Sequence, residues 1–130
     1  MTGLDTSVVV RLLTGQPADQ SARATDLLDK LFEAGQKAKV SDLVVSETYF
    51  ALQCHYHVPK AEALAVLKGF LESSEIEASD VALAVLDTPK LASAKPGFVD
   101  RLIHLEYFRS VGTMATFEKK AAKLEGTTVL

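Results

Sequence analysis

The sequence contains one cysteine, Cys54, among its 130 residues. A single thiol forms neither an intrachain disulfide framework nor a multi-cysteine zinc site, so both are excluded and a reducing compartment is indicated. The N-terminus lacks the basic and apolar regions of a secretory signal, and charged residues interrupt each apolar stretch before the roughly 20 residues that a bilayer requires. We therefore expect a cytoplasmic protein with no membrane span.

Glycine and proline are also scarce, with seven and four residues, and no repeat or low-complexity tract divides the chain. We expect a single domain over residues 1–130. Hydrophobic residues at 48% and charged residues at 24% are typical of a folded protein and exclude intrinsic disorder. The net charge of −3 argues against a protein that holds nucleic acid by bulk charge alone.

The hydrophobic pattern alternates between short apolar segments and longer helical stretches. Helices are predicted over residues 17–33, 42–55, 59–73, 79–86 and 98–111. Short segments rich in β-branched residues lie near the N-terminus and at residues 39–40, 76–78, 113–116 and 127–130. Strands this short, connected by helices long enough to be crossovers, predict an α/β domain with a parallel sheet. Functional sites in such sheets gather beyond the carboxyl ends of the strands.

The predicted helix over residues 42–55 is unusually apolar. We expect most of its large side chains to be buried: Leu43, Val44, Tyr49, Phe50 and Leu52. Glu47 lies within this run and needs a partner, because burying a lone charge is costly. Neutralisation, an arginine or a metal ion would each serve. Cys54 is interpreted as a small buried hydrophobic residue.

Three other acidic residues lie where predicted strands or loops lead into helices. Asp5 follows the first apolar segment, where a carboxylate can bind a metal or act as a nucleophile or base, but can equally cap a helix. Asp100 and Glu118 occupy first-turn positions, where the helix dipole alone favours an acid by about 0.3–1 kcal/mol. Each position has an ordinary explanation, so the information lies in the combination of these acids with Glu47.

Four segments carry this combination: LDTSVVVRLL at 4–13, VSDLVVSETY at 40–49, GFVDRLIH at 97–104 and ATFEKK at 115–120. In order and spacing, the chain resembles the PIN-domain family, the fold of the VapC-type toxin nucleases of prokaryotic toxin–antitoxin pairs. The resemblance implies a three-layer α/β/α sandwich with a short, mainly parallel central sheet.

The resemblance also implies a Mg²⁺ or Mn²⁺ site formed by Asp5, Glu47 and Asp100, with Thr6 or Ser7 as a neighbouring hydroxyl. The fourth family position departs from the pattern, which is usually Thr-x-Asp, because this chain has Thr116-Phe117-Glu118. The additional methylene of Glu moves the carboxylate by more than about an ångström in a site whose metal prefers an octahedron. Altered metal affinity, a water-mediated contact and lost activity all remain open.

Such a cluster supports metal-assisted hydrolysis of phosphodiesters. Two carboxylates 4 Å apart repel each other by about 4 kcal/mol at an effective dielectric of about 20, and a divalent cation removes this cost. We assign Asp5 and Asp100 as direct ligands, and Glu47 as a ligand or the group that orients water. Glu118 is assigned an outer-shell or second-metal role.

Several cationic and hydroxyl side chains near these acids are candidates for supporting the site or binding the RNA backbone. They are Thr6, Ser7, Arg11, Arg101, Thr116 and Lys119. Arg11 has an alternative role, because its planar guanidinium suits a carboxylate of the site or of a partner. His104 follows Asp100 by four residues and would share its helix face as a second ligand, although a surface or interface histidine is commoner.

The leading hypothesis is a metal-dependent endoribonuclease, held inactive by a cognate antitoxin and homodimeric, as the resemblance implies. Tyr56 and the helix over residues 59–73 are candidates for a dimer face or an antitoxin groove, with core packing as the default. The alternative is a catalytically impaired PIN-like binding module in which Glu118 no longer supports cleavage. A receiver or haloacid-type phosphoryl-transfer domain is disfavoured, because Thr6 and Ser7 occupy the positions where those families need acids.

Overall fold

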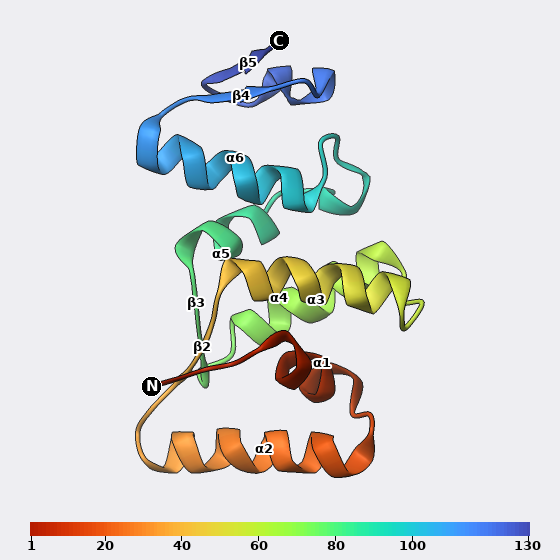
Figure 1. Cartoon of the computed structure of the whole chain (residues 1–130), viewed down its shortest axis with the longest axis vertical. Helices are drawn as coiled ribbons and strands as arrows, with labels where there is room; N and C mark the ends of the chain where they lie inside the picture. Colours follow the sequence, from red (N-terminus) through yellow and green to blue (C-terminus); the bar gives the residue numbers. More distant parts are fainter. The chain divides into compact units, whose positions relative to one another are not determined.

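A computed structural model describes residues 1–130, which form two compact units, Met1–Leu83 and Ala84–Leu130. The first unit contains β1 (Thr2–Gly3), α1 (Thr6–Thr14), α2 (Ala18–Glu33), β2 (Ala38–Val40), α3 (Asp42–Cys54), α4 (Lys60–Leu71) and β3 (Ile76–Ala78) (Figure 1). Helix α5 (Asp80–Leu86) contains the boundary between the units. The second unit continues with the 3₁₀ helix η1 (Leu91–Ser93), α6 (Phe98–Val111), β4 (Met114–Thr116), the 3₁₀ helix η2 (Lys119–Lys123) and β5 (Thr127–Val129).

All strand pairs are parallel. In the first unit the order is β1-β2-β3, with Ala38 of β2 in register with Thr2 of β1 and with Ile76 of β3. In the second unit β4 pairs with β5, with Met114 opposite Thr127. The predicted α/β class with parallel strands is therefore confirmed. The strands form two sheets where the sequence predicted one, and the three-layer sandwich and the single domain stay predictions.

Helix ends follow the local chemistry of their capping residues. Ser41 caps α3 by accepting a hydrogen bond from the backbone N–H of Val44 at 3.3 Å, and Gly112 ends α6 in the left-handed conformation that glycine favours. Helix α1 was not predicted. Its run of three valines, Val8 to Val10, resembles a strand, whereas the structure caps the segment as a helix at Asp5.

Amphipathic stripes build the core of the first unit. The inner face of α4 consists of four buried apolar residues, Ala63, Leu64, Leu67 and Leu71. Helix α1 contacts both α2 and α3, and α3 contacts α4 (Figure 1). None of the six α-helices combines the length and the apolar character needed to cross a membrane.

The burial predicted for α3 is partly wrong. Tyr49 and Leu52 are buried as expected, but Leu43 is 78% exposed and Phe50 is 51% exposed. Cys54 is also exposed. Leu43, Phe50 and Cys54 are spaced by seven and four residues, so they share one helix face. Because α3 is apolar on nearly all sides, its hydrophobic pattern did not identify which face is buried.

Candidate functional site

Asp5 lies where the chain leaves the first sheet. The backbone N–H of Leu4 donates to the carbonyl of Lys39 at 2.9 Å and so extends the pairing of β1 with β2. Asp5 then caps α1, because its Oδ1 accepts from the backbone N–H of Thr6 at 2.6 Å and its Oδ2 accepts from Ser7 Oγ at 3.3 Å. The carboxylate is thus both a helix cap and an exposed group beyond the carboxyl end of a parallel strand.

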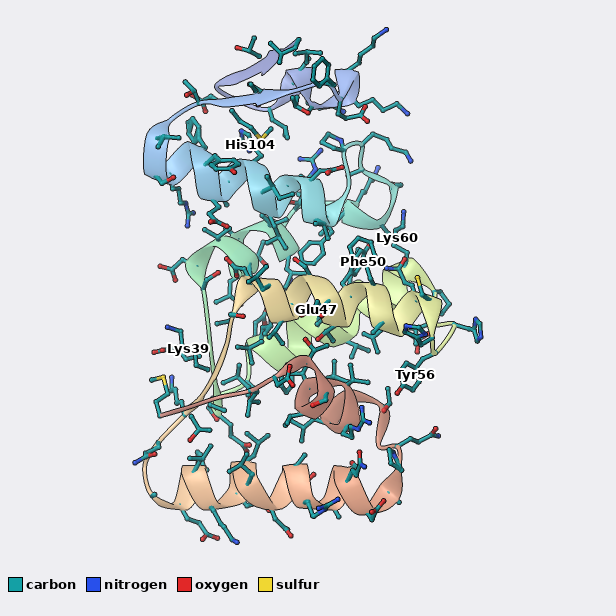
Figure 2. All side chains as sticks on the ribbon, viewed as in Figure 1. Lys39, Glu47, Phe50, Tyr56, Lys60 and His104 are labelled. Atoms are coloured by element: carbon teal, nitrogen blue, oxygen red, sulfur yellow. The ribbon has the colours of Figure 1, made fainter.

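Thr6 connects the two acids of the first unit. Its backbone N–H binds Asp5, and its side chain Oγ1 donates to Glu47 Oε1 at 3.3 Å. Figure 2 shows Glu47 on α3. The side chain of Glu47 is exposed, so the expectation that its charge is buried is wrong. Glu47 follows Leu43 by four residues and therefore shares the exposed face of α3.

Near Glu47, Tyr49 points into the core and is 5% exposed. Burial raises the pKa of the Tyr49 hydroxyl, and a hydrogen bond with the side chain of Gln53 partly offsets this. Tyr49 therefore stays protonated at neutral pH and is a structural rather than an acid–base residue.

Arg11 contacts polar groups other than acids. Its Nε donates to Gln20 Oε1 at 2.7 Å, and one terminal nitrogen donates to the carbonyl of Ser7 at 3.4 Å. Arg11, Ser7, Gln20 and Arg23 line a cavity of about 250 Å³. The guanidinium is therefore held beside Ser7 by Gln20 of α2, and no ion pair joins it to a carboxylate of its own chain.

In the second unit, Asp100 is exposed in the first turn of α6. The neighbouring Arg101 is partly buried, and its Nε donates to the carbonyl of Pro96 at 2.7 Å. Arg101 thus ties the start of α6 to the preceding loop, which is a structural role that the sequence did not predict.

His104 is buried on α6 (Figure 2). Its Nε2 lies 2.7 Å from the carbonyl oxygen of Glu125, and its ring stacks on Phe108 with centroids 5.7 Å apart. Of the two expected roles, a surface histidine is wrong and an interface histidine stays a prediction. The structure also gives no support to a ligand pair with Asp100, because Asp100 is exposed whereas His104 packs against the segment before β5.

Glu118 caps η2 at the end of β4. Its Oε1 accepts from the backbone N–H of Lys120 at 3.0 Å, and its own N–H donates to Thr116 Oγ1 at 3.0 Å. The side chain of Lys119 is exposed beside this turn. The prediction of a first-turn acid is therefore wrong by one position, because Glu118 is the N-cap of η2, and one of its two oxygens already has a backbone donor.

The four acids are divided between the units, with Asp5 and Glu47 in the first and Asp100 and Glu118 in the second. Neither unit groups three or more His, Cys, Asp or Glu side chains so that they could hold a metal ion. The four-acid cluster therefore stays a prediction. Two carboxylates and two hydroxyls at the start of α1 are an oxygen donor set of the kind Mg²⁺ prefers, and Mg²⁺ usually takes only one or two carboxylates.

One polar contact at the sheet edge was not predicted from the sequence. Ser79 Oγ donates to Asp42 Oδ1 at 2.6 Å and so joins the ends of β2 and β3. The two residues line a cavity of about 460 Å³ that also includes Lys39, Glu77 and Asp80. A signal was available, because the dipeptide Ser-Asp follows both strands directly.

Comparisons of the chain with models of protein families, with curated proteins and with solved structures find no match. The functional argument therefore depends on the residues themselves and on the chemistry that their placement allows.

Proposed function

We propose that this protein is a metal-dependent endoribonuclease of the PIN-domain kind and the toxin of a toxin–antitoxin pair. The observation that supports the proposal most directly is the contact of Thr6 with both Asp5 and Glu47. Thr6 and Glu47 are 41 residues apart in the sequence, so the fold brings the two acids to the same residue. These acids match the first two motifs of the family that the sequence resembles. Asp5 lies beyond the carboxyl end of β1, where α/β proteins place their chemistry.

The oxygen donors of this set suit Mg²⁺ or Mn²⁺. Asp5 and Glu47 would hold the cation, with Asp100 and Glu118 as the further acids that the family resemblance implies. When bound, the cation neutralises the carboxylates and leaves positions for a substrate phosphate oxygen and the attacking water. Ser7 and Thr6 orient the carboxylates through the hydrogen bonds described above.

In the proposed reaction, water attacks the phosphorus of an RNA phosphodiester. The water oxygen loses a proton and bonds to phosphorus, the ester P–O bond on the opposite side breaks, and the leaving oxygen takes up a proton, so that the net change is the addition of one water molecule. Glu47 accepts a hydrogen bond from the attacking water and orients it, because its carboxylate is exposed and accepts only one weak hydrogen bond at 3.3 Å from Thr6. Arg11, Arg101 and Lys119 are proposed to flank the RNA backbone.

The test is cleavage of single-stranded RNA with Mg²⁺ or Mn²⁺. Asp5→Asn and Asp100→Asn are each expected to lower the rate by roughly a hundredfold or more, and a chelator is expected to abolish cleavage. Asp29→Asn, which removes an exposed acid from α2, is the matched control and should cleave at the wild-type rate. Cleavage that survives chelation, or that both active-site variants retain, would contradict the proposal.

A second candidate is a PIN-like module that binds without cleaving. The capping role of Glu118 favours it, because an oxygen that accepts from the Lys120 N–H is oriented toward its own turn. This candidate predicts no turnover with any divalent ion, even after Glu118→Asp. Turnover that appears or rises in Glu118→Asp would instead assign Glu118 to the metal site and leave the nuclease proposal in place.

The proposal includes a cytoplasmic homodimer inhibited by an antitoxin. A groove of about 340 Å³ between α1, α3 and α4 supports a partner site, since Tyr56 and Val66 line it and Glu62 provides a negative charge for a basic partner side chain. Val66→Arg is expected to keep RNA cleavage and to lose inhibition by the antitoxin, and continued inhibition would exclude this groove.

The proposed homodimer is tested by light scattering, which should give twice the mass of one chain. A monomer at all concentrations would exclude the dimer.

A further inference from the structure

Phe117 is the most exposed of the large hydrophobic side chains in the chain, at 80%. It directly follows β4, at the carboxyl end of the sheet of the second unit. Phenylalanine is normally among the buried residue types, because its transfer out of water is favourable. The ring therefore remains in solvent at the edge where a parallel sheet places its binding residues.

The backbone on both sides of Phe117 is fixed. Before it, Thr116 is paired with Val129 in the sheet, and its carbonyl accepts from the N–H of Leu130 at 2.8 Å. After it, the N–H of Glu118 donates to Thr116 Oγ1 and the Glu118 carboxylate caps η2. These bonds fix the backbone on both sides of Phe117, so the position from which its side chain projects is set before any ligand binds. A backbone that is already ordered loses less conformational entropy on binding.

The surroundings of the ring are charged rather than apolar. Lys119, Lys120 and Lys123 are all exposed in η2, against the acids Glu118 and Glu125 in the same segment. Glu118 directs one carboxylate oxygen onto the backbone N–H of Lys120. Protein–protein interfaces are depleted of lysine and glutamate at their centres, so this setting does not suit a protein partner.

We propose that Phe117 is a stacking platform for a base of single-stranded RNA, with Lys119 and Lys120 contacting the adjacent phosphates. Aromatic side chains flanked by cations are the usual means of binding single strands, since every base presents a π-face and every linkage a negative charge. The inference rests on the proposed function and extends it, because a base is free to stack on Phe117 only where it is not already stacked in a duplex.

The chain has no tryptophan, so Phe117→Trp introduces a single tryptophan at the proposed platform, and its fluorescence can be excited selectively over that of the three tyrosines. In chelator, where no cleavage occurs, a short oligouridylate is expected to quench this fluorescence to saturation, and a duplex RNA of the same length is not. Phe32→Trp is the matched control, because Phe32 is another exposed aromatic residue on α2. Quenching that is absent, or equal at both positions, would overturn the proposal.

Anisotropy of a labelled oligouridylate tests the same inference without a new fluorophore in the protein. Phe117→Ala is expected to weaken binding roughly tenfold, with Phe117→Tyr close to wild type and Phe32→Ala unchanged. Replacing Lys119 and Lys120 by glutamine removes contacts with two phosphates of a single strand. The slope of log Kd against log salt concentration should therefore fall by about 1.4. An RNA affinity that is unchanged in Phe117→Ala overturns the proposal. This is also the result expected if the ring binds a protein partner instead of RNA.

Failure of this inference and failure of the nuclease are distinguishable. Binding is measured in chelator and depends on Phe117, whereas cleavage is measured with metal and depends on Asp5 and Asp100. A chain that cleaves RNA but shows no effect of Phe117→Ala on binding would refute the stacking platform alone. A chain that binds through Phe117 but never cleaves would refute the nuclease alone.

Discussion

At the scale of single residues, Asp5 has a structural role and a proposed chemical role. Its carboxylate caps α1 through the N–H of Thr6, and in the proposed reaction it holds a metal ion. Asparagine caps a helix about as well as aspartate, whereas alanine does not. The two duties can therefore be separated by the choice of substitution.

Asp5→Asn is expected to leave the free energy of unfolding within a few tenths of a kcal/mol of wild type, and Asp5→Ala to lower it by about 1 kcal/mol. Urea denaturation measures both. If the carboxylate also binds the catalytic metal, both variants should lose RNA cleavage to a similar degree. An Asp5→Asn protein as unstable as Asp5→Ala would show that the charge, rather than the cap, stabilises α1.

Thr48, in contrast, has a side-chain hydroxyl that makes no hydrogen bond. The residue is fully buried in α3, and its Oγ1 has no hydrogen-bond partner. An unsatisfied buried hydroxyl costs about 1–3 kcal/mol, and valine has nearly the same shape without it. Thr48→Val is therefore expected to raise the melting temperature.

The matched control for Thr48 is Thr25→Val. Thr25 is exposed on α2, and its hydroxyl donates to the carbonyl of Ser21 at 3.0 Å. This change should alter the melting temperature little or lower it slightly, since the lost hydrogen bond is replaced by water. A Thr48→Val protein that melts below wild type would indicate that the hydroxyl binds a buried water.

At the scale of elements, the pairing of β4 with β5 depends on a close approach of two turns. Gly126 precedes β5 with φ at +73°, and its carbonyl accepts from the N–H of Met114 at 3.0 Å. A Cβ at Gly126 would collide with the carbonyl oxygen of Gly112, which ends α6. The sheet of the second unit therefore requires the absence of a side chain at this position.

Gly126→Ala is expected to destabilise the protein by more than about 2 kcal/mol, since it combines the cost of a positive φ with a steric clash. Gly15→Ala is the matched control. Gly15 has a similar φ of +71° but open space around its Cβ position, so the expected loss is about 1 kcal/mol. Equal losses of stability in urea denaturation would show that β4 and β5 adjust to the clash.

The elements were more predictable than the contacts between them. Helix ends followed from local signals such as Ser41 and Gly112, which act within one turn. The cap formed by Asp5 was one of its predicted roles, whereas Glu118 was predicted in a first turn and caps η2 instead. The contact of Thr6 with Glu47 joins residues 41 positions apart, and the buried face of α3 depends on the helices around it. Neither is encoded in a local pattern.

At the scale of the whole molecule, the proposed metal site combines four acids that lie far apart in the sequence, Asp5, Glu47, Asp100 and Glu118. A ligand that binds only the folded chain stabilises it by about 2.7 kcal/mol at a hundred times its Kd. Metal binding should therefore be visible as a change in the thermal stability of the entire chain.

Mn²⁺ is expected to raise the melting temperature of the wild type, and Asp5→Asn and Asp100→Asn are each expected to remove most of this increase. Scanning calorimetry with and without Mn²⁺ provides the measurement, with Asp29→Asn as the control that keeps the full increase. An increase lost in Asp5→Asn but retained in Asp100→Asn would restrict the metal to the first unit. The absence of any increase at millimolar Mn²⁺ would count against the site.

The shortness of the strands has a consequence for behaviour at high concentration. Only β2 has hydrogen-bonded strands on both sides, so the other four are edges that expose backbone donors and acceptors. Long, flat edges act as templates for aggregation. None of these strands exceeds three residues, so each offers too few unpaired groups to align a second chain. At high concentration, the short edge strands therefore disfavour edge-to-edge pairing between molecules, and no helix or loop needs to cover the edges.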